Sequence, residues 1–285
     1  MDHISFSVPK QSIFVYLGEN GSGKSTTIRM LTTVLKPDGG RVLYGDLELG
    51  RDNASIRKII ASIPQFNAIH STLTVHENIY TYYRMRLYSH EEAIRTTDQV
   101  IVSYGLESYR NSKVGTLSGG YKRRVEVGRA LETNAPIIFL DEPTTGLDPA
   151  SKRLVWEKLK QAKHAGKTIF LTTQLMEEAE ALADYVTFIK AGQILDSKPI
   201  DQLKEVFSNH NVVVEFCSTI DESLLPYPIS HKEGYRYILA PGEKIPPEEV
   251  LHHLSQQGLP IHSFAPHQST MEDIYFHIMG GQYHG

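Results

Sequence analysis

The sequence contains a single cysteine, Cys217, among its 285 residues. An intrachain disulfide and a cysteine-rich zinc site are therefore excluded, which favours a reducing, cytoplasmic compartment. No apolar run approaches the roughly 20 residues needed to cross a bilayer, so work at a membrane would require another chain to supply the span. The 29 basic residues are outnumbered by 33 acidic ones and form no strongly basic block, which argues against a nucleic-acid partner.

Apolar segments rich in β-branched and aromatic residues alternate with stretches of helical periodicity along the first 205 residues. A helix is expected after the first strand, with Ile28, Leu31, Val34 and Leu35 on one face, and residues 67–134 are expected to form a mostly helical subdomain. Strands alternating with helices predict an α/β fold with a mainly parallel sheet covered on both faces. The expected strands are residues 13–17, 41–45, 137–140, 168–172 and 186–189.

The character of the sequence changes after about residue 205. Residues 212–216 and 235–239 have the composition of strands, and residues 247–258 predict a helix closed by glycine. With roughly 150 residues per domain as a guide, 285 residues suit one large domain with a small companion. We therefore expect a first domain at 1–205 and a small α+β domain at 206–285.

A glycine-rich segment of the form G-x-x-x-x-G-K-[ST] lies between the first strand and the first helix. Its glycines let the backbone wrap a phosphate group, the helix N-terminus supplies N–H groups, and Lys24 adds a full positive charge. The Ser25 hydroxyl suits Mg²⁺. The strand-and-helix context disfavours a glycine-rich turn that matches by chance. The expected phosphate-binding residues are Gly18, Glu19, Asn20, Gly21, Ser22, Gly23, Lys24, Ser25 and Thr26.

Two acidic residues, Asp141 and Glu142, follow the apolar strand at 137–140. Beside a phosphate loop, Asp141 can hold Mg²⁺ through water, and Glu142 can polarise an attacking water as a catalytic base. An apolar strand that ends in acids is common by itself. Combined with the glycine-rich segment, it predicts binding of a nucleoside triphosphate.

A second candidate anion site precedes the helix expected from residue 122 onward. Ser118, Gly119 and Gly120 would place a hydroxyl and two backbone N–H groups at a helix N-terminus. The alternative is an ordinary serine N-cap, which taken alone is the more common role. Both interpretations stay open on these residues alone.

Taken together, these motifs resemble the ATP-binding subunits of ATP-binding cassette (ABC) transporters over about residues 3–205. The resemblance implies a P-loop cassette that binds and hydrolyses ATP with Mg²⁺, although the strand that opens the family's cassettes is missing here. It rests on five motifs in the family's order: the phosphate loop, Gln65, Leu117-Ser118-Gly119-Gly120-Tyr121, Asp141-Glu142 and Thr145-Gly146-Leu147-Asp148.

In that family two cassettes face each other, so the resemblance implies that Ser118, Gly119, Gly120 and Asp148 contact the ATP of the partner cassette. Asp148 followed by Pro149 is also a good N-cap, and both roles can hold. The resemblance further implies that Gln65 binds Mg²⁺ and senses the membrane partner. A lone glutamine after a strand is otherwise commonly a plain surface residue.

Three further segments look like the daunorubicin-resistance branch of exporter ATPases: residues 31–40, 171–180 and 269–275. That branch implies a separate ABC-2 type membrane subunit, a second ATP-binding subunit in a homodimer, and a place on the cytoplasmic face of the membrane. It also implies a C-terminal accessory domain. It implies a hydrophobic drug-like compound or a lipid as cargo. The sequence does not name the cargo, because the substrate contacts would lie in the membrane subunit.

The sequence departs from the family pattern at Gln174, where most cassettes carry a histidine. An amide can still donate a hydrogen bond to the γ-phosphate, but it carries no proton or positive charge near neutral pH. The daunorubicin-type branch is known for glutamine at this position. We therefore expect slowed or differently timed hydrolysis, with Gln174 as a catalytic residue.

A second departure concerns the 17 residues before Gly18. The family's extra strand carries an aromatic ring that stacks on adenine, and that ring is absent here, while Tyr16 is expected to be buried. Because base stacking contributes about 1–3 kcal/mol per base, weaker affinity and weak discrimination between ATP and GTP are expected. A misplaced start codon would explain the short beginning.

Four tyrosines with Arg84 and Arg86 follow Gln65, in the region that receives the transporter's cytoplasmic helix in the family. They would either line a groove for that helix or pack the helical subdomain. The tyrosines are Tyr80, Tyr82, Tyr83 and Tyr88.

Two other functions compete with the exporter ATPase. One is a soluble ABC-type ATPase acting on ribosomes or DNA, and the other is a nucleotide-dependent regulator without transport.

Overall fold

The computed structural model describes residues 1–65, 69–207, 211–242, 245–267 and 269–279. The chain divides into two compact units, Met1–Pro199 and Ile200–Gly285. The boundary expected after residue 205 lies within helix α8 (Ile200–Phe207), which belongs to the second unit. In the described part of the chain, no helix combines the length and apolar character needed to span a membrane.

A six-stranded sheet in the order β4-β5-β6-β1-β7-β8 forms the centre of the first unit. The first five strands in this order are parallel, and β8 pairs antiparallel to β7 across a tight turn at Ala191 and Gly192, both with positive φ. The mainly parallel α/β sheet is thus confirmed, with β8 as an edge strand that the sequence pattern did not predict. The strands are β1 (Ile13–Gly18), β4 (Ile60–Ile63), β5 (Ile137–Asp141), β6 (Thr168–Thr173), β7 (Tyr185–Lys190) and β8 (Gln193–Pro199).

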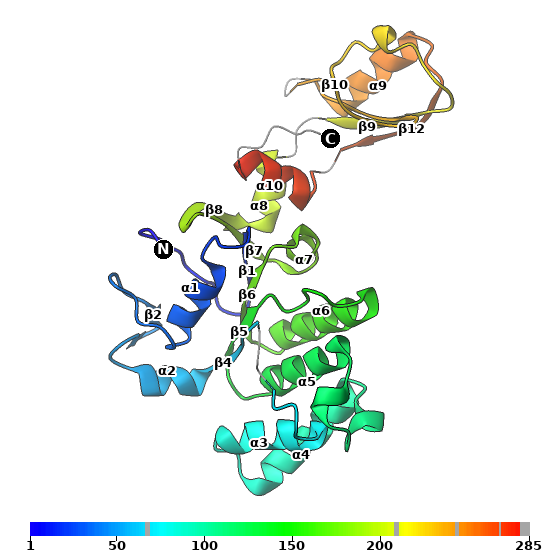
Figure 1. Ribbon diagram of the computed structural model, residues 1–285. Coiled ribbons are helices and arrows are strands. Elements are labelled where there is room, and N and C mark those ends of the chain that lie inside the picture. Colours follow the sequence, from blue (N-terminus) through cyan, green and yellow to red (C-terminus); the bar gives the residue numbers. More distant parts are fainter. Residues whose placement is uncertain (66–68, 208–210, 243–244, 268, 280–285) are drawn as a thin grey trace. The chain divides into compact units, whose positions relative to one another are not determined.

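Helices cover both faces of this sheet (Figure 1). On one face lie α1 (Lys24–Leu31) and α2 (Asn53–Ile59), and on the other lie α5 (Gly119–Leu131), α6 (Pro149–His164) and α7 (Met176–Leu182). Aromatic rings fill the core, where Phe14 and Phe170 stack at 5.5 Å between centroids. Tyr16 packs beside them and is fully buried, as expected.

The expected helical subdomain contains α3 (Val75–Met85), α4 (His90–Ser103) and α5, with two short 3-10 turns at Glu107–Tyr109 and Val114–Thr116. Both α3 and α4 begin with a capping box, formed by Thr74 with Glu77 and by Ser89 with Glu92. These reciprocal hydrogen bonds satisfy backbone donors at each helix start. Residues 67 and 68 of the expected span lie outside the described residues.

Helix α1 is shorter than the apolar pattern predicts. It ends at Leu31, and Thr33 takes a left-handed backbone conformation with φ of 66°. The N–H groups of Val34 and Leu35 both donate to the carbonyl of Arg29, which closes the helix end. Val34 and Leu35 are 74% and 44% exposed, so the expectation that they continue the buried helical face was wrong. The strand expected at 41–45 is likewise only β2 (Leu43–Tyr44), paired with β3 (Leu47–Glu48).

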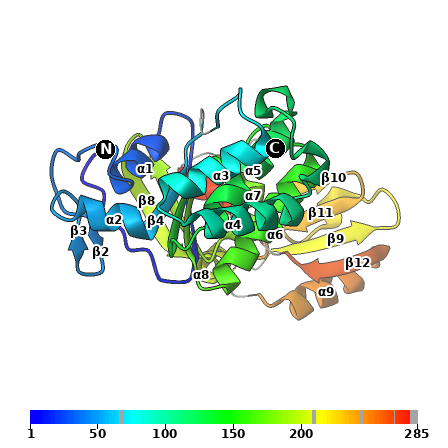
Figure 2. The ribbon, with the colours of Figure 1, turned by 90° about the horizontal axis from the view of Figure 1, so that it is seen from below.

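The second unit is an antiparallel four-stranded sheet with helices, in the order β10-β11-β9-β12 (Figure 2). Val250 and Leu254 of α9 (Pro247–Gln256) pack against the buried strand residues. Strands β9 and β11 and helix α9 lie where the sequence predicts them. The single cysteine, Cys217, lies just after β9 and is exposed. The remaining elements are α8, a 3-10 turn at Glu222–Leu224 and α10 (Met271–Met279), and the strands are β9 (Val212–Phe216), β10 (Ile229–Glu233), β11 (Arg236–Leu239) and β12 (Ile261–Pro266).

Candidate nucleotide-binding site

The glycine-rich segment wraps the N-terminus of α1 directly after β1. Gly23 is the residue before the helix and has φ of 107°, a left-handed conformation that a side chain would strain,. The first four N–H groups of a helix have no partner within it, so those of α1 can bind a ligand that lies against this loop. The Ser22 hydroxyl is buried without a hydrogen-bond partner in the described part of the chain. The segment therefore offers a set of unused donors, which suits a phosphate group.

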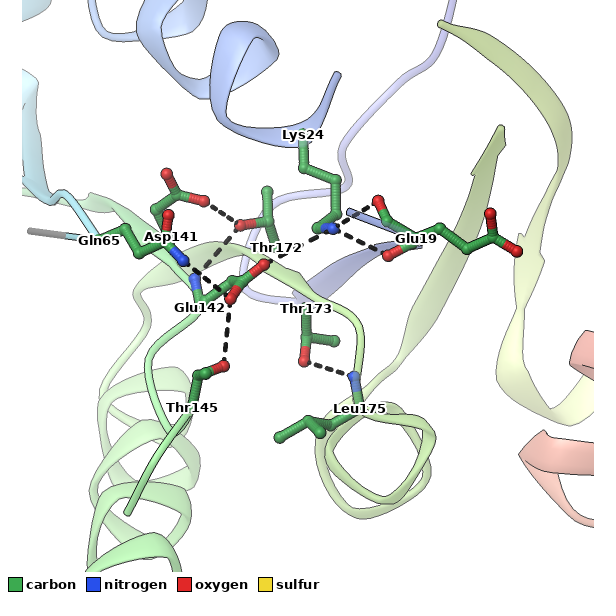
Figure 3. A network of polar contacts seen from close by, with 10 residues as sticks. Glu19, Lys24, Gln65, Asp141, Glu142, Thr145, Thr172, Thr173 and Leu175 are labelled. Atoms are coloured by element: carbon green, nitrogen blue, oxygen red, sulfur yellow. Dashed lines mark hydrogen bonds and ion pairs between the residues drawn. The ribbon is translucent and has the colours of Figure 1, made fainter. Parts of the chain in front are cut away.

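Lys24 points back across this loop from the first turn of α1 (Figure 3). Its Nζ donates hydrogen bonds to the carbonyl oxygens of Gly18, at 2.8 Å, and Glu19, at 3.0 Å. Nζ also lies 3.6 Å from Oε1 of Glu142, and both side chains are about 95% buried, with 4% and 6% exposed. Burial lowers the pKa of Lys24, and the Glu142 carboxylate opposes that shift. The cation thus already has a counter-charge.

Asp141 and Glu142 lie where β5 ends, next to the end of β6. The Thr172 hydroxyl donates to Oδ1 of Asp141 at 2.6 Å, which fixes that carboxylate. Oε2 of Glu142 accepts from the side-chain amide of Gln65, at 3.0 Å, and from the Thr145 hydroxyl, at 3.2 Å (Figure 3). The Glu142 carboxylate is therefore contacted by Lys24, Gln65 and Thr145, which follow β1, β4 and β5 along the chain.

Gln174 follows β6 and is half-buried. In the part of the chain that the structure describes, its side-chain amide makes no hydrogen bond, so its donors are available to a ligand. The turn beneath it is held by the N–H of Leu175, which donates to the Thr173 hydroxyl at 3.0 Å (Figure 3). A fixed turn with an uncommitted amide is suited to contact a phosphate oxygen.

Ser118, Gly119 and Gly120 open helix α5 on the surface of the first unit. Ser118 is the N-cap residue, but its side chain makes no capping hydrogen bond. An added Cβ on Gly120 would lie 3.2 Å from Oδ2 of Asp148, so these segments are neighbours. Asp148 caps α6 by accepting from the N–H of Ser151 at 3.0 Å. The N-cap role is thus found for Asp148, whereas the Ser118 hydroxyl remains uncommitted.

The chemistry of the expected metal ligands suits Mg²⁺. Ser25 offers a hydroxyl, Gln65 an amide oxygen and Asp141 a carboxylate, and hard cations prefer such oxygen donors. The Gln65 amide nitrogen is directed at Glu142, which leaves its oxygen unused by that bond. In the described segments no cluster of three or more His, Cys, Asp or Glu side chains forms a metal site.

Sequence reasoning missed several residues that hold this site. Thr172 and Thr145 contact the two acids directly, and Arg123 on α5 donates to the backbone around them. One usable signal was present: Arg123 lies four residues before Val127 and seven before Ala130, on the buried face of its helix,. A charged residue on an apolar face needs a partner.

The pattern that describes the ABC transporter family matches residues 1–145. The chain is 30% identical to the daunorubicin/doxorubicin resistance ATP-binding protein DrrA of Streptomyces peucetius, covering 98% of this chain and 88% of that protein. It is 34% identical to the Nod factor export ATP-binding protein I of Bradyrhizobium diazoefficiens, covering 98% and 91%. A solved ATP-binding cassette, dimeric and bound to ADP and Pi after hydrolysis, matches with a TM-score of 0.62 and 25% identity over 68% of this chain and 88% of that one.

Proposed function

This chain belongs to the ABC transporter family and is one of its ATP-binding, ATP-hydrolysing subunits, and we propose that it drives export of a hydrophobic drug-like compound or lipid through a separate ABC-2 type membrane subunit. The names of its relatives, in drug resistance and Nod factor export, support export of such cargo. The observation that carries the site is the convergence of Lys24 and Gln65 on Glu142.

In this proposal the phosphates of ATP lie on residues 18–26, and Ser25, Gln65 and Asp141 hold Mg²⁺. The metal would neutralise charge that develops on the phosphates. In the structure Lys24 is paired with Glu142. Phosphate oxygens attract Lys24, which frees Oε1 of Glu142 to accept a hydrogen bond from the attacking water. Gln174 donates its amide to the γ-phosphate.

We propose that a second copy of this chain completes each nucleotide site. Ser118 and Gly119 are exposed, as is Asp148, so a facing cassette can reach them. The Ser118 hydroxyl is free of a capping bond, and with Gly119, Gly120 and the N-terminus of α5 it forms an anion-binding set. These residues would contact the γ-phosphate of the nucleotide held by the other copy.

An open hollow of about 520 Å³ supports contact with a membrane subunit, and hence a position at the cytoplasmic face of the membrane. Its lining includes Val34, Arg57, Tyr82 and Arg86, and Val34 is 74% exposed. Arg86 donates to the carbonyl of Ile60 at 2.9 Å. A lining that combines apolar side chains, such as Val34, with the cations Arg57 and Arg86 suits an amphipathic helix from another chain,.

The four tyrosines divide between the two roles weighed from the sequence. Tyr83 is fully buried, and Tyr88 packs against it with ring centroids 5.1 Å apart, so both pack the helical subdomain. Tyr80 bonds to His90. Tyr82 alone among them lines the hollow, with the Arg129 guanidinium 4.7 Å from its ring centroid. Tyr82 is therefore the ring that supports helix docking.

Mg·ATP hydrolysis by the purified chain tests the catalytic part of the proposal. We expect turnover that is lost in Glu142→Gln and in Ser118→Arg, because the first removes the base and the second blocks the facing site. Mixing the two inactive variants should restore activity at one of the two composite sites of a mixed dimer. Full activity of Glu142→Gln would refute the assignment of the base, and failure of the mixture to recover would refute the shared site.

A matched pair of variants tests the membrane contact. Val34→Asp places a charge in the hollow, and Val102→Asp places one at a comparably exposed position of α4, since the two valines are 74% and 64% exposed. We expect only Val34→Asp to abolish co-purification with the membrane subunit, with ATP binding intact in both. Equal co-purification of both variants would reject the hollow as the docking surface.

A further inference from the structure

Arg123, which lies one turn into α5, carries a guanidinium that is buried where β5 ends. Its side chain is 9% exposed. Nε donates to the carbonyl of Pro143 at 2.7 Å, and Nη2 donates to the carbonyls of Asp141, at 3.1 Å, and Glu142, at 3.0 Å. Nη1 bonds to the Glu126 carboxylate at 2.8 Å. One planar group therefore holds three consecutive carbonyls.

These carbonyls flank a strained residue. Glu142 has φ of 47°, in the left-handed region that a residue with a side chain occupies only at an energetic cost,. On the other side of the segment, the N–H of Glu142 donates to the carbonyl of Thr172 at 3.0 Å. From this backbone conformation the side chain of Glu142 reaches Lys24 and Gln65.

The chemistry of arginine fits this task closely. Its donors lie in one rigid plane, so they can serve several acceptors at once, whereas a lysine ammonium is a single point. Glu126, one turn later on the same helix, orients the guanidinium and balances its charge. The acceptors are backbone carbonyls, so the bond pattern acts on the course of the chain at Glu142 and leaves the Glu142 carboxylate free of Arg123.

We infer that Arg123 is a positioning residue for the ATPase reaction, which fixes the left-handed backbone of Glu142 from the helix that begins at Ser118. This inference rests on the proposed function, in which Glu142 is the base and Ser118 contacts the nucleotide of the facing copy. Arg123 then ties the part of the cassette that contacts one ATP to the base that acts on the other.

The expected consequence is a selective loss of turnover. A misplacement of about 1 Å at a reacting group costs on the order of 10²-fold in rate. Arg123 touches none of residues 18–26, and among the proposed Mg²⁺ ligands it contacts only the backbone carbonyl of Asp141, whose carboxylate is held by Thr172. Arg123→Ala should therefore lower kcat by roughly 10²-fold while the Kd for a non-hydrolysable ATP analogue with Mg²⁺ stays within about twofold. Arg123→Lys should be slow as well, because one ammonium cannot hold three carbonyls.

The experiment measures kcat and analogue Kd for the full chain and for Arg123→Ala, Arg123→Lys and Lys122→Ala. Lys122→Ala is the control, because it removes a positive charge from the same turn of α5. Millimolar guanidinium should restore much of the turnover of Arg123→Ala, and equal methylammonium should not. If Arg123→Ala does not fold, the change in kcat is compared with the change in analogue Kd for Arg123→Lys instead.

Wild-type kcat in the Arg123 variants, or loss of analogue affinity in step with kcat, would overturn the inference. The inference would also be overturned if Arg123→Ala folds but added guanidinium does not restore its turnover, because the Arg123 side chain would then act by more than its hydrogen bonds. Glu142→Gln is measured alongside. Full turnover of Glu142→Gln would refute the base itself, whereas an inactive Glu142→Gln with a fully active Arg123→Ala would refute only the positioning role.

Discussion

The ion pair between Lys24 and Glu142 should stabilise the folded cassette and compete with the phosphates of ATP for Lys24. At 3.6 Å and an effective dielectric constant of about 20, the attraction between two unit charges is about 4–5 kcal/mol, which is an upper bound. Lys24 keeps two carbonyl acceptors when Glu142 is neutralised, and the amide of a glutamine still accepts from Gln65. We therefore expect a coupling free energy of about 1–2 kcal/mol between the two side chains.

The assay is a double-mutant cycle in urea with Lys24→Met, Glu142→Gln and the double variant. Trp156 is the only tryptophan, and it lies on α6 of the cassette, so its fluorescence reports unfolding of this unit. Thr145→Val combined with Lys24→Met is the matched control. Thr145 donates to the other carboxylate oxygen of Glu142, so removing its hydroxyl leaves the ion pair in place and should show almost no coupling.

The same contact predicts a change in nucleotide affinity. Because ATP must draw Lys24 away from Glu142, Glu142→Gln should bind a non-hydrolysable ATP analogue about 5- to 30-fold more tightly, the equivalent of 1–2 kcal/mol. A coupling energy below about 0.5 kcal/mol would refute the argument, since that is the scatter of independent sites. Unchanged analogue affinity in Glu142→Gln would refute it as well.

Three further results are expected. Burial raises the pKa of Glu178 in the folded chain, so its contribution to stability is complete below the unfolded pKa and is lost as the pH rises through the folded pKa. Glu178→Gln should therefore gain Tm over wild type as the pH rises above the unfolded pKa, by about 2–4 °C per kcal/mol, and a pH-independent difference would contradict this. Gln174→Ala should slow turnover by roughly 10- to 100-fold through loss of a γ-phosphate donor, and equal rates would reject that role. Leu87 is 86% exposed with φ of 68°, so Leu87→Asn should raise the urea-unfolding free energy by about 0.5–1 kcal/mol, whereas a lower value would contradict strain there.

The central strands and the phosphate loop could be predicted because their signals are local. β5 and β6 are short apolar runs, and β1 leads into a glycine-rich segment with a fixed spacing. Parallel strands meet at one edge with their carboxyl ends, so Lys24 and Glu142 could be expected to lie together although 118 positions separate them,. The pattern of residues was sufficient here because each motif carries its own geometry.

The pattern failed where the backbone departs from regular geometry. Val34 and Leu35 continue the apolar spacing of α1, yet the left-handed conformation of Thr33 ends the helix before them. Nothing in threonine itself favours that conformation. The hydroxyl of Thr33 accepts from Nε of Arg57 at 2.7 Å, a contact between residues 24 positions apart, which local periodicity does not contain.

Apart from Arg123, whose place on a buried helix face was a usable signal, the residues that hold the Glu142 segment were beyond prediction for the same reason. Glu178, fully buried on α7, accepts from the Thr144 hydroxyl at 2.8 Å and from Trp156 at 3.3 Å. In the sequence it is one of several glutamates on an amphipathic helix. Its role depends on where α6 and α7 meet the chain after β5, and that position is set by packing of the whole sheet.

The chain from Asp141 to Asp148 is held at almost every step by a different element. Arg123 of α5 holds the first three carbonyls, Glu178 of α7 holds Thr144, and Thr145 donates back to Glu142. Asp148 then caps α6. This one segment contains both the proposed base, Glu142, and Asp148, which is proposed to face the second copy. A substitution in α5 or α7 that disturbs the segment should therefore alter hydrolysis and dimer contact together, even where the substitution leaves the phosphate loop untouched.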